Sequence, residues 1–335
     1  MTLFTNKKIL ITGATGLVGS NLVEEFMKHE NVSVVLLARD ENKVRALFQK
    51  YFNRKNFTYH IQDIRLPFNF DDDFDYIFNA AGSISHNEIY KCPVHIIDTN
   101  VLGARNCLEY AKSHKCRVIL FSSATIYASA EAADVQLDET QTNMTDCLDL
   151  PVCTYSQAKR MVETYARAYF NQFGTDIVIA RLSYVYGFSK YVPDTALYEF
   201  VISALRGKDI VLKGKNYQRR DNIYIDDVIR LLLYISKYGQ SGEAYNISSN
   251  LEGGNFAAID EIARLIALNA NIIKGTRIAV YGEYFNDKDR KKGIILDNSK
   301  LKSLSTENKL KITSLDSGIF NTLCKYNEYE NSRNV

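Results

Sequence analysis

The feature that most constrains the fold of this chain is a regular alternation of two sequence patterns. Short apolar runs rich in β-branched residues, typical of buried strands, alternate with longer stretches in which apolar residues recur at helical spacing. The predicted strands are residues 8–12, 33–38, 58–61, 76–79, 118–121 and 177–180, and the predicted helices between them are 18–28, 41–51, 94–113 and 155–173. Because such apolar strands are buried on both faces, helices must cover both sides of a parallel sheet. The pattern predicts a doubly wound α/β fold, whose ligand lies outside the carboxyl ends of the strands.

Composition and charge exclude several other classes of protein. The chain has 41 Lys and Arg against 39 Asp and Glu, and a net charge of +2 does not favour a nucleic-acid partner. No apolar run approaches the roughly 18 residues that span a bilayer, so we expect no membrane insertion. The six cysteines form no C-x-x-C pair and the five histidines show no metal-like spacing. We therefore expect no metal, reduced thiols and a cytoplasmic location.

A glycine-rich segment follows the first predicted strand and opens the first predicted helix. Its spacing, Gly13-x-x-Gly16-x-x-Gly19, stands in the context that phosphate binding requires. Glycines allow a tight turn and a close approach of backbone to a pyrophosphate, and the helix N-terminus supplies N–H donors. The sequence therefore predicts a Rossmann-type domain that binds NAD(P). The expected cofactor contacts in this segment are Gly13, Thr15, Gly16, Leu17 and Val18.

The rhythm of the sequence changes after about Gly187. Helical patterns at 195–206, 226–237 and 256–269 are then separated by short strands such as 244–248 and 277–280. We interpret residues 188–335 mainly as a smaller α/β substrate lobe. Residues 1–187, with crossing segments from the C-terminal half, form the predicted NAD(P)-binding domain. Because no proline-rich or low-complexity linker separates the two, we expect them to share a continuous interface.

The end of the second predicted strand indicates which nicotinamide cofactor binds. In this fold an acidic residue there takes the ribose 2′-hydroxyl of NAD, whereas an arginine accommodates the 2′-phosphate of NADP. The strand runs into Arg39 and then Asp40. The planar guanidinium of Arg39 suits a phosphate, so NADP(H) is favoured, and Asp40 keeps NAD(H) as the alternative.

Two further segments point to acid–base chemistry. Tyr155 and Lys159 form a Tyr-x-x-x-Lys pair at the start of a predicted helix, where positions i and i+4 share one face. A nearby ammonium stabilises a phenolate, so Lys159 is expected to lower the pKa of Tyr155 toward the range of a general acid or base. Ser123 follows the fifth predicted strand, residues 118–121, at the end where a doubly wound sheet presents groups to its ligand.

Together these segments resemble the extended short-chain dehydrogenase/reductase family, the nucleotide-sugar epimerases and dehydratases. The resemblance covers nearly the whole chain. Its other segments are Asp63-Ile64, Asn79-Ala80-Ala81-Gly82, Asn100, Arg181-Leu182-Ser183-Tyr184-Val185-Tyr186-Gly187 and Arg220-Asp221-Asn222-Ile223-Tyr224-Ile225-Asp226-Asp227.

The resemblance implies roles for individual residues. Tyr155 would donate or accept a proton at a sugar hydroxyl or carbonyl, and Lys159 would hold the nicotinamide ribose. Ser123 would hydrogen-bond the reacting oxygen, and Thr125 falls where family members contact the sugar. The further residues implied at the cofactor are Asp63, Ile64, Ala80, Ala81, Gly82, Asn100 and Tyr184. The residues implied at the diphosphate of a nucleotide-diphosphate sugar are Arg220 and, as an assistant, Arg290.

The chain departs from the family pattern at two informative places. Family dehydratases carry an Asp-Glu pair where Ala124 and Thr125 stand here, and uronate decarboxylases use a glutamate at the second position. Both reactions are therefore disfavoured but stay as alternatives. Tyr184 also replaces a family asparagine, which leaves the local substrate contacts open.

The chemistries left are reduction of a 4-keto sugar and 4-epimerisation, both through hydride transfer at sugar C4. Ser123 and Tyr155 serve either reaction. We place the reduction slightly ahead because Arg39 favours NADPH, on which biosynthetic reductions draw. The rival class is a non-catalytic NAD(P)-binding regulatory protein. A homodimer is expected, since the helical patterns at 94–113 and 155–173 resemble the family's dimer-forming pair.

Overall fold

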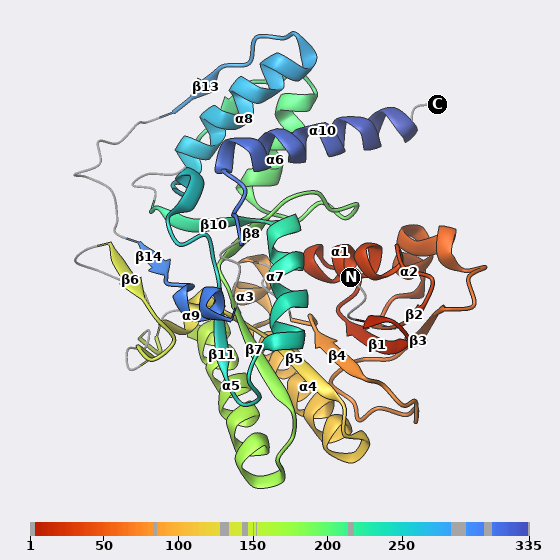
Figure 1. Cartoon of the computed structure of the whole chain (residues 1–335). Coiled ribbons are helices and arrows are strands. Elements are labelled where there is room, and N and C mark those ends of the chain that lie inside the picture. Colours follow the sequence, from red (N-terminus) through yellow and green to blue (C-terminus); the bar gives the residue numbers. More distant parts are fainter. Residues whose placement is uncertain are drawn as a thin grey trace.

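The computed structural model describes residues 4–82, 86–127, 134–142, 147–149, 151, 153–213, 218–282, 293–304 and 310–333. Its centre is a seven-stranded parallel sheet in the order β11-β7-β5-β4-β1-β2-β3 (Figure 1). The strands are β1 (Lys7–Thr12), β2 (Val32–Ala38), β3 (Phe57–Ile61), β4 (Tyr76–Asn79), β5 (Arg117–Ser123), β7 (Ile177–Leu182) and β11 (Ala244–Ile247). The strand order reverses direction between β1 and β4, which places a ligand crevice at their carboxyl ends.

Both faces of the sheet are buried, because apolar residues occupy successive positions along each strand. In β1, Ile9 and Ile11 pack into one apolar cluster, whereas Leu10 packs into a second cluster on the opposite face. In β2, Val34 and Val35 divide between the same two clusters. Side chains alternate faces along a strand, so this all-apolar pattern requires helices on both sides. The structure confirms the predicted doubly wound α/β fold.

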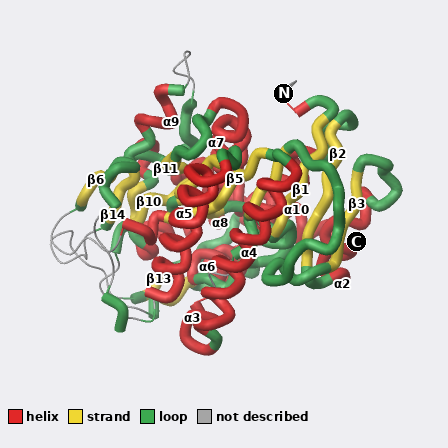
Figure 2. The backbone as a smooth tube through the Cα atoms, turned by 90° about the horizontal axis from the view of Figure 1, so that it is seen from below, coloured by secondary structure: helices red, strands yellow, loops and turns green. Residues whose placement is uncertain are grey.

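Helices from distant parts of the chain cover the two faces. On one face lie α1 (Leu17–Phe26), α2 (Glu41–Phe48) and α7 (Ile225–Tyr238). On the other lie α4 (Pro93–His114) and α5 (Cys153–Phe173), which pack against each other and run side by side in Figure 2. The shorter helical segments are η2 (Gln49–Tyr51), α3 (His86–Lys91) and η3 (Ala124–Tyr127).

The C-terminal half adds small sheets and further helices. In these sheets β8 (Tyr184–Tyr186) and β12 (Phe256–Ala257) lie on either side of β10 (Arg220–Tyr224), and β9 (Ile210–Val211) pairs with β13 (Val280–Tyr281). The third sheet pairs β14 (Ile294–Leu296) with β6 (Val135–Leu137), a strand from the N-terminal half. The helical segments are α6 (Ala196–Leu205), η4 (Glu252–Gly254), α8 (Ile259–Lys274), α9 (Ser299–Ser303) and α10 (Leu315–Arg333). The predicted helix 256–269 is wrong at its start, because residues 256 and 257 pair with β10 and α8 begins at residue 259.

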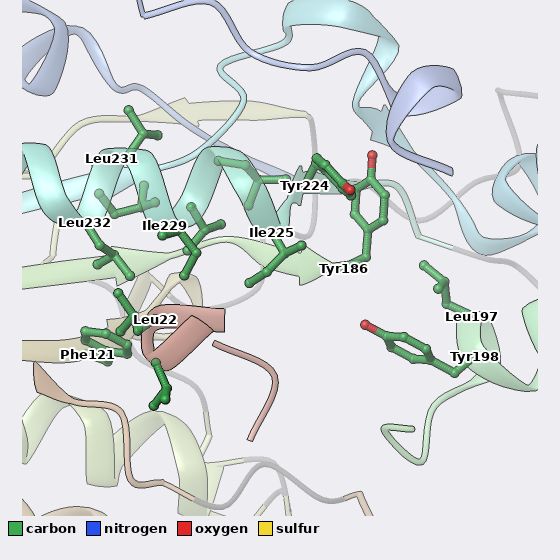
Figure 3. Packing of buried hydrophobic residues seen from close by; sticks show 14 of the residues in the cluster. Leu22, Phe121, Tyr186, Leu197, Tyr198, Tyr224, Ile225, Ile229, Leu231 and Leu232 are labelled. Atoms are coloured by element: carbon green, nitrogen blue, oxygen red, sulfur yellow. The ribbon is translucent and has the colours of Figure 1, made fainter. Parts of the chain in front are cut away.

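One apolar core joins the two halves. Leu22 of α1 and Phe121 of β5 belong to the same cluster as Ile225 of α7 and Tyr198 of α6 (Figure 3). The α7–β11 segment, from the C-terminal half, covers and extends the central sheet. The carboxyl ends of the central strands and the start of β10 are therefore held by one continuous packing arrangement.

Candidate functional site

The glycine-rich segment makes the turn between β1 and α1. Gly13 has φ +61°, and the N–H of Gly16 donates to the Gly13 carbonyl at 3.0 Å. A Cβ on Gly13 would lie 2.6 Å from the backbone of Ala80, and a Cβ on Gly19 would lie 2.3 Å from the Gly13 carbonyl oxygen. Gly16 is the N-cap of α1 and has no side chain that could cap the first turn. The backbone N–H groups of that turn can therefore donate to phosphate oxygens. Thr15 lies in this loop, and Leu17 and Val18 begin α1.

The loop after β4 is tied directly to the end of β1. The Thr12 hydroxyl donates to Asn79 Oδ1 at 2.8 Å and accepts from the N–H of Ala81 at 3.1 Å. These bonds hold residues 80–82 beside the glycine turn. The sequence-predicted cofactor segments at the ends of β1 and β4 therefore meet at the switch point of the sheet.

A second meeting point lies at Gly82. A Cβ there would lie 2.7 Å from Asn100 Oδ1 and 3.1 Å from Lys159 Nζ, so α4 and α5 both reach this glycine. Asn100 donates from Nδ2 to the Ile96 carbonyl at 2.8 Å. Its Oδ1 is buried and has no hydrogen-bond partner within the described part of the chain. An orphaned buried acceptor beside Gly82 is available to a donor on a bound ligand, such as a ribose hydroxyl of a dinucleotide.

Ser123, Tyr155 and Lys159 come together, as expected from the sequence, and all three are buried. Ser123 ends β5, whereas Tyr155 and Lys159 lie near the start of α5. The Ser123 hydroxyl lies close enough to the Tyr155 phenol to lower the pKa of that phenol. Lys159 Nζ donates to the Phe121 carbonyl at 2.7 Å and lies 5.7 Å from the centroid of the Tyr155 ring.

Burial controls the protonation of this group. It raises the pKa of Tyr155 to about 12, and the neighbouring Ser123 hydroxyl opposes that rise. Burial also lowers the pKa of Lys159 to about 8, against the attraction of Glu163. The expected lowering of the Tyr155 pKa by Lys159 is not found, because desolvation of the phenolate outweighs any stabilisation from the ammonium. At neutral pH the site holds a protonated phenol beside a protonated amine.

A buried ion pair supports the site and was missed in the sequence. Glu163 accepts at Oε2 from Arg181 Nη2 at 2.8 Å and at Oε1 from Arg181 Nε at 3.0 Å and from the Ser122 hydroxyl at 2.5 Å. Arg181 Nη1 also donates to the Tyr127 hydroxyl at 2.7 Å, and Tyr127 donates to Asn246 Oδ1 at 2.7 Å. This network ties α5 to β5, β7 and β11. A single glutamate on a helix gives no sequence signal for such a role.

Three further predicted site residues, Thr125, Tyr184 and Arg220, lie near this group or contact a residue that does. The Thr125 N–H donates to the Ser123 hydroxyl at 3.2 Å, and Thr125 Oγ1 is buried without a partner among the described residues. Tyr184 lies close enough to act electrostatically on Tyr155, and its ring stacks 4.5 Å from the guanidinium carbon of Arg220. Arg220 is exposed at the start of β10 and can donate to an anion. Arg290, also predicted at the substrate, lies outside the described residues.

The expected adenosine end lies at the carboxyl ends of β2 and β3. Asp40 accepts from the N–H of Lys43 at 3.1 Å and so serves as the N-cap of α2. Asp63 binds the Arg65 guanidinium, which holds the pKa of the Asp63 carboxyl at about 2. Ile64 is buried and packs against α4.

The described residues contain neither a metal centre nor a membrane-spanning helix. No group of three or more His, Cys, Asp or Glu side chains is arranged to hold a metal ion there. None of the helices described is long and apolar enough to cross a membrane.

Two proteins with known names are similar to this chain over most of its length. UDP-glucuronic acid decarboxylase 6 of Arabidopsis thaliana is 28% identical over 239 residues, which cover 71% of this chain and 68% of that protein. The dTDP-D-glucose 4,6-dehydratase of Dictyostelium discoideum is 25% identical over 271 residues, which cover 77% of this chain but 62% of that protein.

Solved structures show the same fold. The dTDP-glucose 4,6-dehydratase of Bacillus anthracis in complex with NAD has a TM-score of 0.75 at 22% identity, covering 97% of this chain and 98% of that chain. The UDP-glucose 4-epimerase of Thermotoga maritima with UDP-glucose has a TM-score of 0.74 at 23% identity, covering 96% and 99%. A family model matches residues 9–248, most of the chain. The resemblance inferred from the sequence is thereby confirmed, and the chain belongs to the NAD dependent epimerase/dehydratase family.

Proposed function

We propose that this protein is an NADP(H)-dependent reductase of 4-keto nucleotide sugars. The observation that carries the proposal is the grouping of Ser123, Tyr155 and Lys159 beside Gly82, with Ala124 and Thr125 directly after the serine. The group can deliver a proton to a carbonyl oxygen. Neither residue after the serine offers a carboxylate for loss of water or carbon dioxide.

The residues divide the work of ketone reduction between them. When bound, the nicotinamide supplies the hydride. The Ser123 hydroxyl and the Tyr155 phenol would both hydrogen-bond the ketone oxygen, and Tyr155 would give its proton to the developing alkoxide. With its pKa raised to about 12, the phenol is a proton donor at neutral pH, which is the state that reduction requires. The Lys159 ammonium would stabilise the phenolate left behind.

The preference for NADP(H) rests on the end of β2. Arg39 is exposed there, and the carboxylate of Asp40 is occupied as the N-cap of α2. An engaged carboxylate is less suited to the ribose 2′-hydroxyl of NAD(H), which stays the alternative cofactor. The Bacillus anthracis dehydratase was solved in complex with NAD, and that observation describes the cofactor of that protein only.

The second candidate is a 4-epimerase, because Ser123 and Tyr155 would serve removal and return of a hydride equally well. The relatives named decarboxylase and dehydratase keep those two reactions as outcomes to be tested. A non-catalytic NAD(P)-binding protein would need neither Tyr155 nor Lys159. The cytoplasmic location expected from the sequence is part of the proposal.

Two kinds of partner complete the proposal. Arg220, stacked on Tyr184, would pair with the diphosphate of the nucleotide sugar. A second copy of the chain would cover the outer faces of α4 and α5, which expose Val94 (67%), Met161 (47%) and Phe170 (37%). Sedimentation that shows only monomer at micromolar concentration would contradict the dimer.

The test of the activity follows NADPH and NADH absorbance with 4-keto nucleotide sugars and, in separate reactions, with 4-hydroxy nucleotide sugars and nucleotide uronates, and identifies the products. Stoichiometric oxidation of NADPH with formation of a 4-hydroxy sugar supports the reductase. Isomer exchange without net cofactor use would show an epimerase, and loss of water or carbon dioxide would show a lyase. Tyr155→Phe should lose turnover, whereas Tyr165→Phe on the same helix should keep it. Undiminished turnover in Tyr155→Phe would refute the proton-donor role.

A further inference from the structure

Two arginines and a histidine form a cluster at the carboxyl ends of β2 and β3. Arg39 directly follows β2, Arg65 lies shortly after β3, and His95 lies in the first turn of α4. Arg39 Nη1 is 3.1 Å from His95 Nε2, and Arg65 Nη1 is 3.3 Å from His95 Nδ1. The two guanidinium groups therefore contact opposite nitrogens of one imidazole. We call these three residues the basic cluster.

The basic cluster has more donors than acceptors. A neutral imidazole accepts at one ring nitrogen only, and its other nitrogen carries a proton. One of the two arginine contacts is therefore donor against donor, whichever tautomer is present. The Thr99 hydroxyl lies 3.4 Å from His95 Nε2 and can accept only on that side. Within the described part of the chain, no acceptor is shared by Arg39, Arg65 and His95.

The neighbouring described residues orient the basic cluster but do not supply the shared hydrogen-bond acceptor. Asp63 binds Arg65 through Nε and Nη2, which leaves Arg65 Nη1 directed to the imidazole. Ala38 and Ile61, the last residues of β2 and β3, are paired in register, so the two arginines follow adjacent strand ends. Parallel strand ends at this edge are where the fold recognises the adenosine ribose.

We propose that the basic cluster binds the 2′-phosphate of the adenosine ribose of NADP(H), with Arg65 and His95 as specificity residues beside Arg39. This rests on the NADP(H) preference in the proposed function. A phosphate would accept from both guanidinium groups and from the imidazole N–H, which removes the donor-against-donor contact. Arginine forks and phosphate oxygens match in charge and geometry.

The test compares binding of 2′,5′-ADP and 5′-AMP by calorimetry, because these ligands differ only in the 2′-phosphate. The wild-type protein should bind 2′,5′-ADP at least about 10-fold more tightly, as expected for charge-assisted hydrogen bonds. Arg65→Ala and His95→Ala should each reduce this ratio about 5-fold or more. His95→Ala should leave 5′-AMP binding unchanged, whereas for Arg65→Ala the ratio is the readout, because Arg65 also binds Asp63. Arg45→Ala is the matched control, since Arg45 is an exposed arginine of α2 paired with Glu41. It should keep the wild-type ratio.

Two results would overturn the inference. If Arg65→Ala and His95→Ala keep the wild-type ratio of 2′,5′-ADP affinity to 5′-AMP affinity, these two residues do not bind the 2′-phosphate and the inference is wrong. If the wild-type protein binds both nucleotides equally, the NADP(H) preference fails as well, although a reductase using NADH would survive. Because Arg65 also holds Asp63, Arg65→Lys provides a second variant that keeps the charge but not the fork, and it should also lower the ratio. Neither measurement requires the sugar substrate, so failure of the proposed reaction would be recognised separately.

Discussion

Lys159 is expected to support turnover while lowering the free energy of unfolding of the protein. It is buried, and burial lowers its pKa from 10.5 to about 8. The unfolded chain therefore binds the lysine proton more tightly than the folded chain does, and protonation favours unfolding. This destabilisation is fully present below pH 8 and disappears as the pH rises from 8 toward 10.5. Replacement by an uncharged side chain of similar length, Lys159→Met, should remove it.

The magnitude follows from the two pKa values. At about 1.4 kcal/mol for each pKa unit, the charged lysine costs about 3 kcal/mol of folding free energy at pH 7. Loss of its hydrogen bond to the Phe121 carbonyl returns about 1 kcal/mol. Lys159→Met should therefore raise the free energy of unfolding by about 2 kcal/mol at pH 7, while abolishing turnover. At pH 9.5 the gain should be about 2 kcal/mol smaller, because the folded wild-type lysine is then neutral.

The assay is reversible urea unfolding followed by far-UV circular dichroism, which suits a chain without tryptophan. Wild type, Lys159→Met and Lys208→Met are compared at pH 7 and pH 9.5, with the exposed Lys208 as the matched control. The control should show no comparable gain and no change in its difference from wild type between the two pH values. A difference between Lys159→Met and wild type that stays constant across this pH range would refute the assignment of a buried, destabilising charge.

Three further predictions concern the frame of the site. In the buried ion pair the side chain of Arg181 is 2% exposed and that of Glu163 is 10% exposed, so Glu163→Ala leaves a buried arginine without its carboxylate. The free energy of unfolding, measured by urea titration, should fall by about 3–5 kcal/mol. A loss below about 1 kcal/mol would contradict this. Gly13→Ala places a Cβ 2.6 Å from backbone just beyond β4 at φ +61° and should abolish NADPH binding in fluorescence titration; retained affinity would count against the close packing. The hydrogen bond to Asp71 raises the pKa of His114, so His114→Gln should cost stability below pH 6.5, with the cost vanishing as pH rises through the folded-state pKa in thermal melts; a pH-independent cost would exclude the ion pair.

Much of the frame could be predicted from the sequence. The all-apolar strands near Ile9 and Val34 and the helical periods between them predicted the doubly wound sheet, because burial on both faces leaves a local signature. The glycine spacing and the positions of Ser123, Tyr155 and Lys159 at a strand end and a helix start predicted a candidate site, and the structure brings these residues together. The start of α8 was misplaced, since strand pairing of residues 256 and 257 with β10 depends on a segment remote in the chain.

The tertiary structure alone decided how these groups behave. The partnership of Glu163 with Arg181, the stacking of Arg220 on Tyr184 and the contact of two arginines with His95 join residues from different elements, so no local pattern announces them. Protonation was decided in the same way. Spacing placed Lys159 one turn from Tyr155 and suggested a lowered phenol pKa, but burial raises it to about 12. By itself the sequence determined the strand end that carries Ser123 and the helix face that Tyr155 and Lys159 share, because strand ends and helix faces are local properties. Only the packed structure determined their charge states, because desolvation depends on everything that surrounds a group.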